Sequence, residues 1–123
     1  MASPNLISAN LILGKTSGIL LSNTNEISVL ENPAGSGECL KINTLNLANY
    51  GSSTTTVTVN YHTATSLGGS SFAIAGNIIV PASSTMNIID KSSQYYLDEN
   101  TSIGARAAGA GNIVVTVSYE EIS

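Results

Sequence analysis

The chain has 123 residues, a common size for one domain and long enough to bury a single hydrophobic core. Charged residues make up 10% of it and the net charge is −4, whereas typical domains are about 25% charged. The four basic residues lie far apart, so the chain lacks the positive cluster that binding to nucleic acid requires. We expect one domain with a surface of hydroxyl and amide groups, and no nucleic-acid partner.

The beginning of the chain is rich in apolar residues. Segments 10–14 and 17–22 have strand character, and together they carry more apolar side chains than one edge strand can bury, while Pro4 disfavours pairing at the start. We predict an N-terminal arm or edge strand over residues 1–14 and a sandwich domain over residues 15–123. The arm residues expected to contact a neighbouring subunit or a larger particle are Leu6, Ile7, Leu11 and Leu13.

Targeting signals and long apolar runs are missing from this sequence. The start lacks the basic region and the continuous apolar stretch of a secretory signal, and no segment approaches roughly 18 consecutive apolar residues. We therefore expect a soluble protein that is made in a cytoplasm and has no membrane partner.

The rest of the chain alternates strand-like segments with turns rich in Gly, Ser and Asn. The breaks recur about every 8 to 12 residues, and no segment keeps a helical period. This spacing predicts an all-β fold: an antiparallel β-sandwich of the jelly-roll or immunoglobulin-like kind, or a flattened barrel. The predicted strands lie within 26–31, 39–50, 54–64, 70–81, 84–90, 94–98, 102–108 and 112–122.

The longest of these segments, 39–50, changes its pattern part-way. Leu40 and Ile42 share one parity, whereas Leu45 falls on the other, so a regular strand would send these side chains to opposite faces. A β-bulge at 43–44 would return them to one face. The alternative is a regular strand with both faces covered, one by the core and the other by a neighbouring subunit.

Candidate catalytic and metal-binding residues are few. His62 is the single histidine and Cys39 the single cysteine, which leaves no ligand set for a metal and no nucleophile paired with a base. His62 has the parity opposite to Val57, so we expect it to be exposed on its strand. Residues 98–100 lack the ligand spacing of a calcium loop and are predicted to be a solvated hairpin turn. The sequence indicates no enzyme activity and no cofactor.

The closing strand, 112–122, alternates clearly. Val115 and Val117 fall on the face predicted to enter the core, and Val114 falls on the other face. A monomer of this size would leave the apolar surface around Val114 exposed to water, so we predict that Val114 belongs to an interface. The protein is then a homo-oligomer or completes its fold contacts only in the assembly.

The stretch "VPASSTMNIIDKSSQYYLDENTSIGARAAGAGNIVVTVSYEEIS", residues 80–123, resembles the closing half of small virion structural proteins of tailed phages, especially of marine cyanophages. Residues 39–61 resemble the earlier half of that group, in which a strand ending in Asn precedes a hydroxyl-rich turn and a valine-rich strand. The sequence "DENTS" replaces the usual acidic-glycine turn. The matching positions in the closing half are Pro81, Ala82, Thr85, Tyr96, Leu97, Glu99, Ile103, Ala105, Ala107, Ser118, Tyr119, Glu120 and Glu121.

This resemblance implies a non-enzymatic virion structural protein, attached to the head shell as a decoration or cement protein, or to the neck, tail or baseplate. Its partners would be other virion proteins, such as a major capsid, neck or tail protein, and its location would be the virion, after synthesis in the host cytoplasm. The alternative is a carbohydrate-binding or adhesin module of a tail fibre that acts through tyrosine-lined loops. Few charges and many hydroxyl groups suit a module covered in a permanent assembly.

Overall fold

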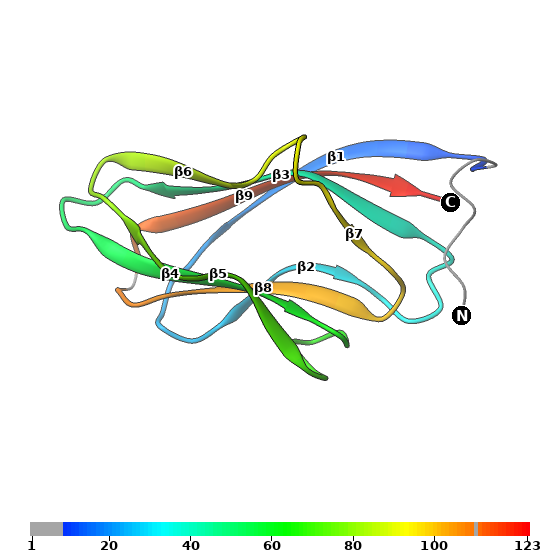
Figure 1. The fold of residues 1–123 in the computed structure, drawn as a ribbon, viewed down its shortest axis with the longest axis horizontal. Helices are drawn as coiled ribbons and strands as arrows, with labels where there is room; N and C mark the ends of the chain where they lie inside the picture. The colour runs from blue at the N-terminus through cyan, green and yellow to red at the C-terminus, as the bar shows by residue number, and fades with distance from the viewer. Residues whose placement is uncertain (1–8, 110) are drawn as a thin grey trace.

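The computed structural model describes residues 9–109 and 111–123 (Figure 1). Within this part of the chain every regular element is a β-strand, which confirms the all-β prediction. The described residues contain no helix, and therefore no helix that could span a membrane. The strands are β1 (Ile12–Leu20), β2 (Ile27–Asn32), β3 (Cys39–Asn49), β4 (Thr55–His62), β5 (Ser71–Val80), β6 (Ser84–Ile89), β7 (Tyr95–Leu97), β8 (Thr101–Ala107) and β9 (Ile113–Ile122).

The strands form two antiparallel sheets that lie as separate layers in Figure 1. The first sheet has the order β1-β9-β3-β6, with β7 also pairing with β3, and the second has the order β2-β8-β4-β5. Neither sheet closes into a barrel. Of the two predicted folds, the β-sandwich and the flattened barrel, the structure has the β-sandwich. With β6 and β7 together occupying one position beside β3, this strand order is that of a jelly roll.

The hydrophobic core fills the space between the two sheets. Along β9, Val115 and Val117 are at most 1% exposed, as the alternation predicted, and their partners across β3 are the fully buried Leu47 and Leu45. Burial of such side chains is the main favourable term in folding, at about 1.5–3 kcal/mol for each. The core therefore fixes which face of β9 points inward.

The bulge predicted in β3 is present. The register between β3 and β9 shifts between Ile42 and Thr44, so Asn43 has no partner on β9. On either side of this extra residue, Leu40 and Leu45 are both buried, at 2% and 0% exposed. One inserted residue thus returns both halves of the strand to the core face, as the change of parity indicated.

Two buried asparagines fasten loops at the ends of strands. Asn32, at the end of β2, donates from Nδ2 to the main-chain carbonyls of Glu38 and Leu97, at 2.9 Å each. Asn49, at the end of β3, donates in the same way to the carbonyl of Val80 at 3.1 Å. Each side chain binds main-chain carbonyls at or near the end of another strand, which replaces hydrogen bonds to water that folding removes.

Residues 98–100 do not form the predicted hairpin turn. They connect β7 in the first sheet to β8 in the second, so the two flanking strands are not paired with each other. Glu99 Oε2 accepts a hydrogen bond from the main-chain N–H of Gly37 at 2.7 Å, which ties this connection to the loop before β3. A hairpin and a crossover have the same turn-forming residues, and only long-range pairing distinguishes them.

Candidate interaction surfaces

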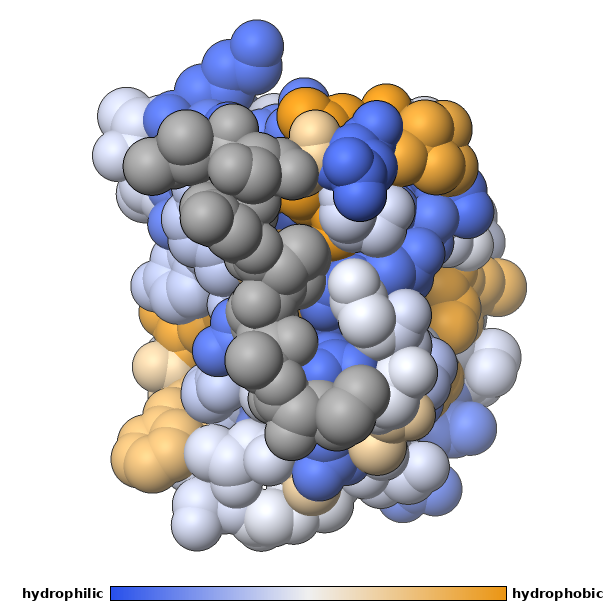
Figure 2. Space-filling model, turned by 90° about the vertical axis from the view of Figure 1, so that its right-hand side faces the viewer, coloured by the Kyte–Doolittle hydropathy of each residue, from blue (hydrophilic) through white to orange (hydrophobic). Residues whose placement is uncertain are grey.

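Exposed apolar side chains gather along β1, an edge strand of the first sheet. β1 pairs with β9 on one side only. Figure 2 looks at the end of the molecule where β1 begins and shows apolar residues, in orange, at its upper edge. Of the residues predicted to form an interface, Leu11 and Leu13 are exposed here, and Leu6 and Ile7 lie outside the described residues. The exposed fractions are 52% for Leu11, 56% for Ile12, 43% for Leu13 and 41% for Leu20.

One charge lies within this edge. Lys15 Nζ lies 2.9 Å from Glu121 Oε1 on the neighbouring strand β9. The hydrogen bond to Glu121 and the attraction of its charge raise the pKa of Lys15 above its ordinary value. The positive charge of β1 is therefore already balanced within the subunit.

Val114 lies on the outer face of the first sheet. It is half-buried, and the residues directly opposite it are Leu20 on β1 and Ala48 on β3. These three side chains form a short apolar row next to the edge. The role of Val114 in an interface stays a prediction.

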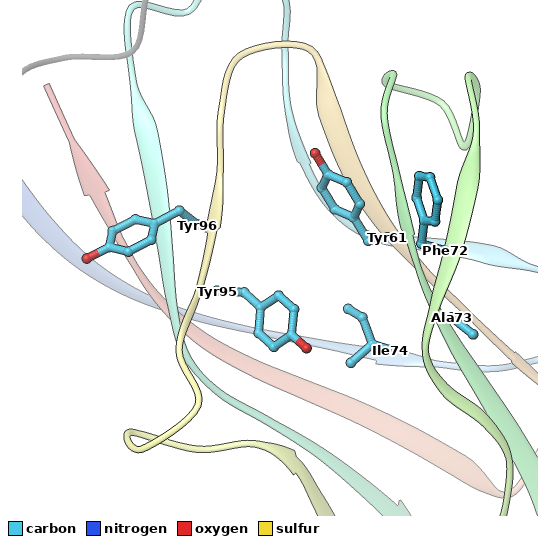
Figure 3. Close-up of a pocket in the computed structure, with 6 residues that line it drawn as sticks. All are labelled: Tyr61, Phe72, Ala73, Ile74, Tyr95 and Tyr96. Carbon is cyan, nitrogen blue, oxygen red and sulfur yellow. The ribbon is translucent and has the colours of Figure 1, made fainter.

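A second surface is an open hollow lined with aromatic rings, with a volume of about 360 Å³. Phe72 is 59% exposed and stands directly opposite Tyr61 in the β4–β5 pairing. In Figure 3 the ring of Tyr95 points toward Ile74, whereas Tyr96 points away from the other side chains. The residues that line this aromatic hollow are Tyr61 from β4, Phe72, Ala73 and Ile74 from β5, and Tyr95 and Tyr96 from β7.

The aromatic hollow lies between the two layers, where the edge strand β5 of one sheet faces β7 of the other. Its side chains offer rings, alkyl groups and, as their polar atoms, phenol hydroxyl groups. Amide and carboxylate side chains, which would hold the hydroxyl groups of a sugar, are absent from the residues that line it. The hollow therefore offers ring faces and phenol hydroxyl groups as its binding groups.

The prediction that His62 is exposed is wrong. His62 is only 4% exposed, and its Nε2 lies 2.7 Å from Glu26 Oε2, an oxygen that also accepts from Asn60 Nδ2 at 3.2 Å. Glu26 and Leu67 lie over the outer face of this sheet at Gly104, where an added Cβ would meet both side chains within 2.6 Å. Segments before β2 and after β4 thus cover a face that strand parity assigned to solvent.

The two candidate residues of the sequence, His62 and Cys39, are buried in different sheets. Cys39, the other candidate, lies at the start of β3 in the opposite sheet and is 3% exposed, and burial raises the pKa of its thiol. Among residues 9–109 and 111–123, no group of three or more His, Cys, Asp or Glu side chains is placed to hold a metal ion. The Glu26–His62 contact is best explained as a link that fastens the covering segment to the sheet.

Comparison with known proteins identifies no family for this chain. No family model and no curated protein matches the chain. Among solved structures, the chain is similar to one described as "Cyanophage Pam1 capsid asymmetric unit", with 14% identity and a TM-score of 0.33. That likeness covers 99% of this chain and 91% of the other. At this identity and TM-score it carries no argument about function.

Proposed function

We propose that the protein is a non-enzymatic structural component of a phage virion, bound to the head shell as a decoration or cement protein, or to the neck, tail or baseplate. Its partners are other virion proteins and further copies of itself. Two features support this proposal: the sequence pattern shared with small phage virion proteins, and the exposed apolar edge.

The residues that carry the resemblance have structural roles in this jelly roll. Ile103, Ala105 and Ala107 in β8 and Leu97 in β7 are all 0% exposed in the core. Glu99 holds the loop before β3 through the N–H of Gly37. The shared pattern therefore specifies the packing of the closing half, which is what proteins with one fold and different attachment sites would have in common.

The observation that carries the proposal is the exposure of Leu11, Ile12, Leu13 and Leu20 on a domain that has only 10% charged residues. Clustered exposed apolar groups are typical of a surface that a partner covers. Each 100 Å² of apolar surface covered contributes about 2.5 kcal/mol before ordering costs, so modest contacts repeated by symmetry hold a subunit in place.

The copy number in purified virions tests the proposal. Quantitative mass spectrometry against the major capsid protein should give hundreds of copies for a shell protein, or roughly six to eighteen for a neck, tail or baseplate ring. A protein that is abundant in infected cells and absent from purified particles would refute a structural role.

The aromatic hollow favours a second candidate, a carbohydrate-binding or adhesin module of a tail fibre. Aromatic rings stack on sugar faces, and Phe72, Tyr95 and Tyr96 are 39–59% exposed. A glycan array with the wild type and Tyr95→Ala separates the candidates. Binding that Tyr95→Ala abolishes would support an adhesin, and an array without binding would count against it.

A further inference from the structure

The free edge of β1 has a defined hydrogen-bonding pattern. Leu11 exchanges two main-chain hydrogen bonds with Ser123, at 3.2 and 2.9 Å, and Leu21 N–H donates to the carbonyl of Ile113 at 2.9 Å. The register between these positions has no shift. In an antiparallel ladder such bonded positions alternate, so odd-numbered residues of β1 bond to β9 and even-numbered residues point their N–H and C=O groups away from it.

β1 is also the most regular long edge in the described part of the chain. The other edge strands of six or more residues, β2, β5 and β6, each pair with their neighbour through a register shift, which marks a bulge or irregularity. Bulges protect an edge from pairing with another chain, and β1 has none. Eight of its nine residues are exposed.

The sequence of β1, "ILGKTSGIL", is nearly symmetric about Thr16. Reading outward from Thr16, Gly14 corresponds to Gly18, Leu13 to Ile19 and Ile12 to Leu20. An antiparallel pair of identical strands places each residue opposite its counterpart in this reversal. Such a strand is complementary to itself, as a two-fold interface requires.

We propose that β1 pairs antiparallel with β1 of a second copy, about a two-fold axis at Thr16, so that two first sheets join into one. Thr16 then faces Thr16 of the second copy, Gly14 faces Gly18, and Ile12 faces Leu20. All five are even-numbered positions, whose main-chain groups point to the free edge, so each facing pair can exchange two hydrogen bonds.

The side chains agree with this register. On the outer face, Ile12 and Leu20 are 56% and 41% exposed in the single subunit. In the dimer, Ile12 of each copy packs against Leu20 of the other. On the inner face, Leu13 meets Ile19 of the second copy. Lys15 faces Ser17 of the second copy and not the other Lys15, and its charge is already paired with Glu121. The lysine that would otherwise protect an edge strand does not oppose the pairing.

A charge at the axis tests the proposal with the purified protein. Thr16→Lys places two like charges directly opposite each other in the dimer, on an exposed position of the subunit, and should weaken self-association at least tenfold. Thr85→Lys is the matched control, because Thr85 is exposed on β6 at the other edge of the same sheet. Sedimentation velocity should show a dimer for the wild type and Thr85→Lys, and a folded monomer for Thr16→Lys.

A cysteine at the axis tests the register. In a hydrogen-bonded antiparallel pair the facing Cα atoms lie about 5.5 Å apart, within the range for a disulfide. Thr16→Cys should therefore form a covalent dimer under mild oxidation, whereas Thr85→Cys and the wild type, whose Cys39 is buried, should not.

A monomeric wild type, a dimer that survives Thr16→Lys, or a Thr16→Cys variant that does not cross-link would each overturn this pairing. A wild type that stays monomeric until another virion protein is added would assign the edge to that protein instead. All of these measurements use purified protein without particles. A result that overturns the β1 pairing would therefore leave the copy-number test of the virion role unaffected.

Discussion

Two aspartate substitutions in β9, three residues apart, test which face of the strand is core and which is interface. Val117 is 1% exposed and lies opposite Leu45, which is fully buried. Val114 is half-buried on the other face, opposite Leu20. We expect Val117→Asp to unfold the subunit and Val114→Asp to leave it folded but impaired in assembly.

The magnitudes follow from the two environments. Val117→Asp loses about 1.5–3 kcal/mol of apolar burial, and an unpaired buried carboxylate adds several kcal/mol more or must take up a proton. Lys15 belongs to the next pair on this face, but its Nζ already lies 2.9 Å from Glu121. The sum is comparable with the entire stability of a typical domain, about 5–15 kcal/mol.

Val114→Asp has a much smaller cost for folding. The new carboxylate reaches water on the outer face, so the loss is limited to strand preference and partial burial, about 1 kcal/mol. The same carboxylate would lie against any partner that covers the row formed by Leu20, Val114 and Ala48, where its desolvation opposes binding.

Far-ultraviolet circular dichroism and urea titration measure folding, and analytical ultracentrifugation with incorporation into particles measures assembly. A Val117→Asp protein with wild-type stability would refute the assignment of the core face. A Val114→Asp protein that assembles as well as the wild type would refute the interface role of Val114.

Three further outcomes follow from other parts of the molecule. Glu26→Ala leaves His62 Nε2 buried without its partner and should lower the free energy of unfolding by about 1–3 kcal/mol in urea titration, whereas a wild-type midpoint would show that the contact contributes nothing. Deletion of residues 1–9 should leave the domain folded by circular dichroism, since Leu11 and its bonds to Ser123 remain, and should reduce incorporation into virions; equal incorporation would reject the arm. Hydrogen bonds from Ser92 and Ser93 lower the pKa of Asp90 below its ordinary value, so their contribution to stability is present above about pH 4 and is lost as the pH falls through the lowered pKa. Ser92→Ala should raise that pKa, as measured by carboxyl chemical shifts in an NMR titration, and an unchanged value would contradict the assignment.

The strands were predictable from the sequence because their signal is local. Alternation in 112–122 and the change of parity within 39–50 depend on neighbouring residues alone, and the core face and the bulge at Asn43 follow from them. The fate of His62 was not predictable in this way. Its burial depends on Glu26, 36 residues earlier, and on a loop that crosses the outer face of the sheet.

The aromatic hollow, like the burial of His62, was not predictable from the local sequence. The tyrosines stand out in the sequence, but Tyr61 and Tyr95 line one hollow because β4 and β5 of one sheet lie near β7 of the other. Parity assigns each ring to a face of its own strand and says nothing about the order of strands. The connection at 98–100 was misassigned for that reason: its residues favour a turn, and the partner strands decide what the turn connects.

The positions that carry the resemblance and those that offer contacts are largely separate. Leu97 and Ile103 are core residues and Glu99 fastens a loop, so the shared pattern is explained by the needs of the jelly roll. β1, with its exposed apolar residues and its symmetry about Thr16, lies wholly outside residues 39–61 and 80–123. A scaffold whose core and contact edge are formed by different residues can be attached to different parts of a particle by changing that edge alone. We therefore expect the residues of β1 to determine the partner of this subunit.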